Sequence, residues 1–221
     1  MTPLIAAEFH CHTVYSPDSL VSIEDLLSTC RQKDIGKIAI TDHNVMAGAF
    51  KAKEMDPERV ILAEEILTTQ GELLGYFMTE PIQRGLAPEV VIEKLKKQGA
   101  FISVAHPFDP HRGSSWEPGT LARIMRDVDG VEVFNARCVR QAYNDEAMAF
   151  AGQHQKLRMA GSDAHTLREL GRAALLMPPF ENAEELRAAV ASAEIRAQLS
   201  GSEVHLFSTA ASVLKKISGQ K

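Results

Sequence analysis

Histidines and carboxylates in this 221-residue chain stand directly after short apolar runs of the kind that form β-strands. Imidazole nitrogens and carboxylate oxygens are together the usual donors of hydrolytic centres built on Zn²⁺, Mn²⁺ or Fe. If the runs are parallel strands, their carboxyl ends open on the same side, and the side chains that follow them converge there. The sequence therefore predicts a metal centre among the polar residues at these strand ends: His10, His12, Asp42, His43, Glu64, Glu65, His106, Glu132, Asn135, Asp163 and His165.

The segment His10-Cys11-His12 gives this prediction its clearest local pattern. Residues two apart on an extended chain point to the same face, so both imidazoles can reach one pocket. Cys11 then points away from them, and we interpret it as a small buried apolar residue. Taken alone, the pair could also be two polar residues of a loop. The histidines that follow other strands favour the metal site.

The elements that must position these residues alternate between strand and helix. Ser22, with Asp25 three residues later, has the spacing of a helix N-cap, and Pro88 suits the first turn of a helix over 88–97. Gly71 permits a hairpin turn between 65–68 and 73–78. The remaining strands are expected at 4–9, 37–41, 60–63, 101–105, 131–134, 158–160 and 173–177, and the remaining helices at 121–127, 139–155, 183–193 and about 204–216.

Alternation of this kind predicts a parallel sheet with right-handed crossovers. Seven or so strand–helix units in 221 residues are too few for a full-size eightfold barrel. We therefore expect an α/β fold, a distorted (β/α)7 TIM-like barrel. Residues 1–221 are expected to form it as a single domain, with the chemical motifs between 10 and 172.

Composition narrows the class of protein further. The formal charge of −5, from 24 basic and 29 acidic side chains, argues against a protein that binds the phosphate backbone of duplex nucleic acid. The charge is still compatible with binding of a single-stranded nucleic-acid end in a metal-lined pocket. Three cysteines without paired spacing, no signal-peptide pattern and no run of 18 apolar residues indicate a cytoplasmic protein with no membrane partner.

Several short motifs carry a resemblance to a known family. They are His10-Cys11-His12-Thr13, Ser16-Pro17-Asp18, Thr41-Asp42-His43-Asn44, Glu65, Ala105-His106-Pro107 and Gly161-Ser162-Asp163-Ala164-His165. In this order they resemble the PHP (polymerase and histidinol phosphatase) family, over residues 10 to about 172. The resemblance implies a distorted (β/α)7 barrel that holds two or three divalent metal ions (Mn, Zn, Fe or Mg) and acts as a phosphoesterase.

The resemblance also implies a set of metal ligands. Glu65 would be the carboxylate that bridges two ions, and its neighbour Glu64 should point the other way. Glu72 stands where many members have a histidine. It can still bind a hard ion, with a preference for Mn²⁺ or Mg²⁺ over Zn²⁺, although a solvated turn glutamate is the alternative. The implied ligands are His10, His12, Asp18, His43, Glu65, Glu72, His106, Asp163 and His165.

Other polar residues in the same loops are candidates for catalysis and for substrate binding. Asp42 is expected to orient a ligand histidine or to contact a bound water, and His111 to protonate a leaving oxygen. Arg112 suits two-pronged recognition of a phosphate, unless it pairs with Asp109. The candidate catalytic residues are thus Asp42, His111 and Arg112, and the candidate substrate contacts are Arg112, Arg137 and Asn135, with Glu132 left open.

The expected activity is hydrolysis of a small phosphorylated metabolite, a nucleotide or an oligonucleotide end by a metal-activated hydroxide. Two alternatives stay open. One is an amidohydrolase-type metal hydrolase, which would normally use a metal-bridging lysine; the other is a non-catalytic metal-binding or partner-binding PHP module. The oligomeric state is open as well, because the last helix carries an apolar seam that could pack on the barrel or on a second chain: Val204, Leu206, Phe207, Val213 and Leu214.

Overall fold

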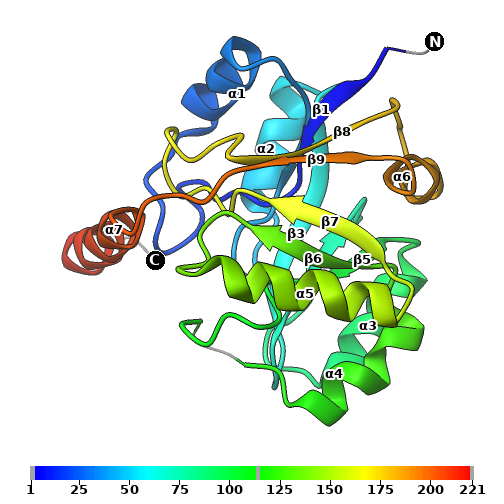
Figure 1. The fold of residues 1–221 in the computed structure, drawn as a ribbon. Helices are drawn as coiled ribbons and strands as arrows, with labels where there is room; N and C mark the ends of the chain where they lie inside the picture. Colours follow the sequence, from blue (N-terminus) through cyan, green and yellow to red (C-terminus); the bar gives the residue numbers. More distant parts are fainter. Residues whose placement is uncertain (1–2, 113–114, 220–221) are drawn as a thin grey trace.

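The strands form one strongly curved sheet in the computed structural model, which describes residues 3–112 and 115–219. Within these residues the strand order is β7-β6-β5-β4-β3-β2-β1-β8-β9 (Figure 1). The predicted α/β barrel is confirmed as a nearly closed, distorted one. The strands are β1 (Ile5–Glu8), β2 (Ile35–Ile40), β3 (Val60–Leu67), β4 (Glu72–Tyr76), β5 (Phe101–Val104), β6 (Gly130–Asn135), β7 (Leu157–Gly161), β8 (Ala173–Met177) and β9 (Glu194–Ala197).

Helices cover the outside of the sheet. Figure 1 shows α1 on one side and α3, α4 and α5 on the opposite side, while α6 and α7 lie at two different edges. Ser22 caps α1 as predicted, because its side chain accepts a hydrogen bond from the backbone N–H of Asp25. The helices are α1 (Ile23–Gln32), α2 (Ala47–Met55), α3 (Pro88–Lys97), α4 (Pro118–Ile124), the 3₁₀ turn η1 (Met125–Asp127), α5 (Gln141–Gln153), α6 (Ala183–Val190) and α7 (Val204–Ser218).

The predicted parallel sheet is confirmed only in part, while the predicted hairpin is present between β3 and β4. β1, β2 and β3 are parallel neighbours, as are β5, β6 and β7, but β4 and β8 run antiparallel to the strands beside them. The hairpin at Gly71 explains β4, because a connection of a few residues can only reverse the chain. Helix α2 and strand β9 were not predicted; α2 has little amphipathic pattern, and β9 is an exposed edge strand.

The barrel is drawn together at the carboxyl ends of β1 and β7. Cys11 and Ala164 form an isolated parallel bridge just beyond these two strands. The backbone N–H of His12 donates to the carbonyl of Ala164 at 2.8 Å, and the N–H of Ala164 donates to the carbonyl of His10 at 3.2 Å. The segments that carry the histidine pair and the Asp163 motif are therefore held side by side by backbone hydrogen bonds.

Aromatic rings fill the barrel below this bridge. Phe9 packs edge-on against Tyr76 and stacks with Phe180, and Tyr76 contacts Phe101. All four rings are almost completely buried, and they belong to one core cluster. The rings thus close the interior of the barrel beneath the histidines.

Within the described residues no helix is long and apolar enough to cross a membrane.

Phe101→Ala should destabilise the fold by about 3–5 kcal/mol, because it removes a ring from a packed core and leaves a cavity. Urea unfolding followed by circular dichroism measures the change. Phe50→Ala is the matched control: Phe50 lies on α2 and exposes 38% of its surface, so the loss should be much smaller. Equal losses of unfolding free energy in the two variants would show that Phe101 does not belong to the hydrophobic core.

Candidate metal centre

Imidazoles and carboxylates from six segments of the chain converge at the carboxyl ends of the strands. Their donor atoms fall into overlapping groups in which every atom lies within 4.8 Å of the others. Each group is held almost entirely by buried or half-buried side chains. The groups are His12, His43 and His165; His10, His12 and Asp163; His10, Glu65 and His106; and His43, Glu65 and Glu72.

The Glu65 carboxylate lies at the centre of these groups. Its Oε1 is 3.0 Å from His106 Nε2 and 3.3 Å from His10 Nε2. Its Oε2 is 2.8 Å from His43 Nδ1 and 3.4 Å from His12 Nε2. Glu65 is the residue of β3 that pairs with Leu74 in the hairpin, and the bridge between His43 and Glu65 brings the loop after β2 against it. A single carboxylate therefore faces four imidazoles.

Hydrogen bonds behind the histidines fix which nitrogen faces the cluster. His10 Nδ1 is 2.9 Å from Glu132 Oε1, and His165 Nδ1 is 2.8 Å from the carbonyl oxygen of Asp163. Because a carboxylate or a carbonyl can only accept, both Nδ1 atoms carry the proton, and a neutral ring keeps its Nε2 lone pair free. This is the usual way in which proteins orient a metal-binding histidine.

His12 is oriented by a chain of two hydrogen bonds. Its Nδ1 is 3.0 Å from Ser16 Oγ, and the Ser16 hydroxyl donates to Asp42 Oδ1 at 2.7 Å. Asp42 also accepts from the N–H and the hydroxyl of Thr13. The serine hydroxyl therefore accepts from His12, and His12 Nε2 is left facing Glu65 and Asp163. Asp42 lies behind the cluster and acts on it through Ser16.

Several buried atoms of the cluster have no hydrogen-bond partner in the described part of the chain: His10 Nε2, His12 Nε2, Asp18 Oδ1 and Glu65 Oε2. Leaving such atoms unpaired in a protein interior is costly, and native structures rarely do so. His12 Nε2 and Glu65 Oε2 lie 3.4 Å apart, and His10 Nε2 is 3.3 Å from the other Glu65 oxygen, so these atoms face one another within the cluster. Nitrogen and carboxylate donors of this kind fit divalent ions such as Zn²⁺, Mn²⁺ or Fe²⁺.

The electrostatics of the cluster also favour a cation. Burial alone would lower the pKa of His10, but the Glu132 and Asp163 carboxylates raise it well above the usual histidine value. Burial would likewise raise the pKa of Glu65, and the imidazoles of His10 and His43 hold it well below its usual value. In contrast, burial together with neighbouring imidazoles lowers the pKa of His12 to about 3. His12 therefore stays neutral and ready to bind a metal.

Strained backbone marks the same place. His106 and Asp163 have positive φ angles of 22° and 52°, and Asn44, next to His43, has 58°. Non-glycine residues rarely adopt this region, and such strain persists only where the surroundings hold it. The N–H of His106 donates to Glu132 Oε2, and Asp163 accepts from Asn135 Nδ2 and pairs with Arg112. These contacts hold the two side chains in the cluster.

Two of the implied ligands lie at the rim of the cluster. Asp18 Oδ2 is 3.0 Å from His165 Nε2 and 3.5 Å from His43 Nε2. Glu72 Oε2 is 3.7 Å from His106 Nε2, and its side chain is 14% exposed. The alternative of a solvated turn glutamate does not fit, because Glu72 faces the cluster from the first position of β4. Burial and the charge of Glu65 raise the pKa of Glu72.

Arg112 is the cation of the cluster. Its Nη2 is 2.6 Å from Asp163 Oδ2 and donates to Asn135 Oδ1, while its Nε donates to Asp109 Oδ2. The pairing with Asp109 that the sequence left open is therefore present, together with a contact to the cluster itself. Asn135 uses its amide to hold Glu132 and Asp163, so it organises the neighbouring acids.

Two other sequence candidates make no hydrogen bond or ion pair with a proposed metal ligand among the described residues. Arg137 is buried, pairs with Glu169 at 3.1 Å, and donates to the Val204 carbonyl and the Ser208 hydroxyl. Its guanidinium therefore holds α7, and the suggestion of a substrate contact is not supported. His111 is exposed, and its ring lies 6.1 Å from that of Tyr143. The loop that continues from it includes Gly113, outside the described residues.

Sequence reasoning left two organising residues unassigned. Glu132 was an open candidate, yet it holds His10 through one oxygen and His106 and Asn135 through the other. Ser16 belonged to a quoted motif but had no role. The available signal was its position, because a hydroxyl between Thr13 and Asp18 can reach both His12 and Asp42. Glu64, as expected, points away and accepts from the N–H of Ile82.

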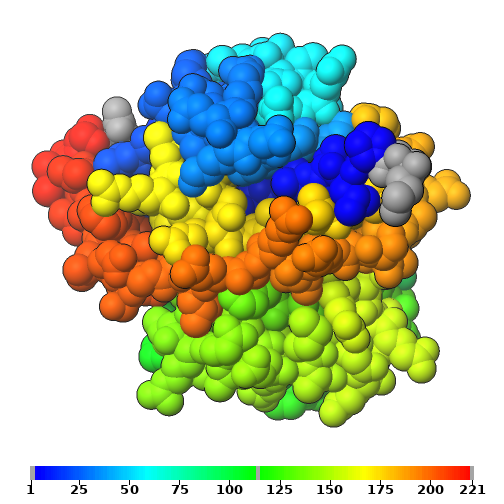
Figure 2. All heavy atoms as spheres, turned by 45° about the horizontal axis from the view of Figure 1, so that its top comes forward, coloured from blue at the N-terminus to red at the C-terminus, as the bar shows by residue number. Residues whose placement is uncertain are grey.

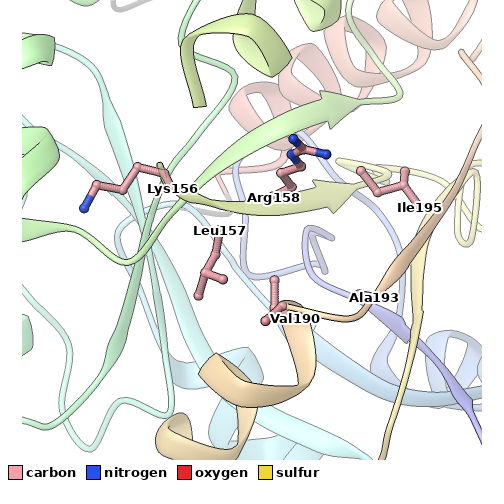
Figure 3. Close-up of a pocket in the computed structure, with 7 residues that line it drawn as sticks. Lys156, Leu157, Arg158, Val190, Ala193 and Ile195 are labelled. Atoms are coloured by element: carbon pink, nitrogen blue, oxygen red, sulfur yellow. The ribbon is translucent and has the colours of Figure 1, made fainter. Parts of the chain in front are cut away.

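A pocket of about 760 Å³ opens beside the cluster at His43. Its wall includes Tyr15, Arg84 and Lys215, so it combines an aromatic ring with two cationic side chains. Another hollow, of about 500 Å³, lies at the start of β7, between it and the α6–β9 connection (Figure 3). Its lining has no histidine, cysteine or carboxylate, whereas the pocket at His43 and a smaller one of about 360 Å³ at His165 both adjoin the cluster.

Gly161→Ala should disturb the cluster, because a methyl group there would lie 2.3 Å from His10 Cβ and 2.8 Å from Glu132 Oε1. Moving His10 off its carboxylate should weaken Mn²⁺ or Zn²⁺ binding by about 10–100-fold. Titration calorimetry measures the affinity. Gly152→Ala is the control, since nothing lies within 4 Å of its added methyl group. Unchanged metal affinity in the Gly161 variant would contradict this arrangement.

Two regions of the chain match known protein families. The model of the PHP domain matches residues 8–75, and that of the PHP-associated region matches residues 141–195. The uncharacterized protein MJ1587 of Methanocaldococcus jannaschii is 39% identical over 144 residues, which are 59% of this chain and 81% of that protein.

Two solved structures share the fold at low sequence identity. One, from Bifidobacterium adolescentis, is provisionally named a metal-dependent phosphoesterase; it is 18% identical with a TM-score of 0.63, over 86% of this chain and 97% of that one. The other is a two-domain protein of Bacteroides vulgatus that contains a predicted PHP-like metal-dependent phosphoesterase, 17% identical with a TM-score of 0.71, over 95% and 70%. On the sequence match and the shared fold, this chain belongs to the PHP domain family.

Proposed function

We propose that the protein is a metal-dependent phosphoester hydrolase. The observation that carries the proposal is the set of buried nitrogen and oxygen atoms that face one another without a hydrogen-bond partner around Glu65. Membership of the PHP family and the fold shared with proteins named as phosphoesterases support the same reaction class. Hydrolysis of a phosphoester needs positive charge near the phosphoryl oxygens, and this cluster is built to hold such charge.

The proposed ligands of two or three divalent ions are the nine side chains of the cluster. Glu65, with one oxygen toward His10 and His106 and the other toward His12 and His43, is the one suited to bridge two ions. When bound, divalent ions supply positive charge that acidifies water and neutralises phosphoryl oxygens. The proposed set is His10, His12, Asp18, His43, Glu65, Glu72, His106, Asp163 and His165.

The chain's own contribution beyond the ligands is the placement of protons and charge. Glu132 and the Ser16–Asp42 pair keep the protons of His10 and His12 on Nδ1. Arg112 adds a fixed positive charge at the edge of the cluster. Its Nη1 makes no hydrogen bond to the described residues, so we propose that it binds an oxygen of the phosphoryl group.

We propose that the pocket beside His43 receives the rest of the substrate. Arg84 is exposed there and has no acidic partner among the described residues, so it can attract an anionic substrate. Tyr15, 38% exposed, offers a ring on which a base or a sugar can pack. These features suit a small phosphorylated metabolite, a nucleotide or an oligonucleotide end.

Glu65→Gln tests the proposal most directly. Purified protein should contain two or more divalent ions per chain and hydrolyse p-nitrophenyl phosphate or its bis-ester with Mn²⁺. The variant should lose metal and lower turnover on the order of 100-fold or more, because the central charge is gone. Elemental analysis and a colour assay give the two readouts. Glu64→Gln is the matched control, since Glu64 faces the Ile82 backbone and should keep both metal and turnover.

Several outcomes would contradict the proposal. Wild-type protein without metal, or with metal but no turnover on a panel of phosphomonoesters and phosphodiesters, would exclude it. Turnover of amide substrates alone would instead indicate an amidohydrolase-type activity. Full turnover in the Glu65 variant would show that hydrolysis occurs elsewhere.

Arg112→Lys should show whether Arg112 acts on the substrate and not on metal binding. Lysine keeps the charge but loses the planar fork, so kcat should fall on the order of 100-fold while the metal content stays unchanged. Arg137→Lys is the comparison, because Arg137 pairs with Glu169 under α7. That variant should lower the melting temperature and leave kcat near the wild-type value. The opposite pattern would mean that Arg137, not Arg112, contacts the substrate.

A further inference from the structure

The last helix, α7, turns apolar side chains toward solvent. Leu206, Phe207, Val213, Leu214 and Ile217 are 72%, 53%, 50%, 55% and 79% exposed. Surface helices of soluble proteins normally turn this face inward. Figures 1 and 2 show α7 at one edge of the molecule. We call these five residues together with the exposed Ala210 the α7 stripe.

Polar contacts on the inner face fix the orientation of α7. Lys215 Nζ donates to the backbone carbonyls of Val14 and Ser16, and Arg137 donates to the Ser208 hydroxyl and the Val204 carbonyl. If α7 rotated to bury its stripe, these buried charged groups would lose their partners, at a high cost. The stripe therefore stays on the outside of a single chain.

The spacing of the α7 stripe is that of a helix–helix seam. Leu206, Ala210, Val213 and Ile217 follow one another at intervals of four, three and four residues, the 3.5-residue repeat that keeps one line of side chains against a second helix. Phe207 and Leu214, seven residues apart, flank this line on one side. Ala210 stands at its middle, where a small side chain allows two helices to approach closely.

The exposed area is close to what a stable dimer buries. Leu20, which is 53% exposed, lies beside α7, because it lines a pocket together with Phe207. With the α7 stripe it presents on the order of 700 Å², close to the roughly 800 Å² per partner of a standard interface.

We propose that the α7 stripe is the interface of a symmetric dimer in which two α7 helices pack antiparallel, with the two Ala210 residues at the twofold axis. A twofold interface must match itself, and this stripe has no charge that would repel its own copy. Antiparallel packing also brings Glu203, at the start of one helix, to the end of the other, where Lys216 lies. The charges at the helix ends then attract.

This arrangement pairs most of the α7 stripe with itself, while Ile217, seven residues beyond the axis at Ala210, lies at the level of Glu203 of the second copy. Leu206 of one copy lies against Val213 of the second, and Phe207 lies against Leu214. Lys215 of α7 lines the pocket at His43. Packing of α7 against the same helix of a second copy would therefore keep this side of the pocket in place. The proposal depends on no metal and can be tested on protein stripped of metal.

The first test is the mass of the protein in solution. Wild-type protein at tens of micromolar should sediment as a dimer, and Leu206→Glu with Leu214→Glu should sediment as a monomer with an unchanged circular dichroism spectrum. Thr209→Glu is the control, because it adds a glutamate to an exposed position of α7 outside the stripe, and it should remain a dimer. A wild-type monomer, including one that binds anionic lipid vesicles, would overturn the proposal.

The second test fixes the geometry. Ala210→Cys should form a disulfide between two chains on mild oxidation, because residues at the twofold axis come within reach of each other. Ile217→Cys should not, since antiparallel helices hold its two copies roughly 20 Å apart. The wild-type chain should stay uncrosslinked, as its described cysteines are buried. Crosslinking of Ile217→Cys, or none at Ala210→Cys, would overturn antiparallel packing.

Discussion

Glu65 places a carboxylate among four imidazoles in a part of the barrel that is closed to water, and the rest of the mouth is arranged around it. Its oxygens lie 2.8–3.4 Å from nitrogens of His10, His12, His43 and His106. A buried charge in such a place is costly unless it is paired. A bound cation would lower this cost, in addition to the positive charge that Arg112 supplies at the edge of the cluster.

The polar residues behind the cluster determine which nitrogen of each histidine carries the proton. Glu132 keeps the proton of His10 on Nδ1, and the Ser16–Asp42 pair does the same for His12. The strained backbone lies in the same place, since His106 and Asp163 both have positive φ angles. Hydrogen bonds from Asn135 and Arg112 stabilise that strain.

The C-terminal helix is tied to the same region from outside. Lys215 binds the backbone of the loop that carries Ser16, so α7 supports the serine that orients His12. Arg137, at the end of the segment after β6, holds the other end of the helix. These buried polar contacts set which face of α7 looks outward, and they leave its apolar side available for a partner. The candidate metal site and the outward face of α7 therefore depend on the same polar contacts.

The sequence by itself determined the family, the alternation of strands and helices, and which side chains follow the strands, because local periodicity and motif spacing are properties of neighbouring residues. It even separated Glu64 from Glu65, since strand neighbours face opposite ways. The tertiary structure alone decided the antiparallel β8, the role of Glu132, the burial of Arg137 against Glu169 and the outward face of α7. These depend on contacts between residues far apart in the chain, which no local pattern records.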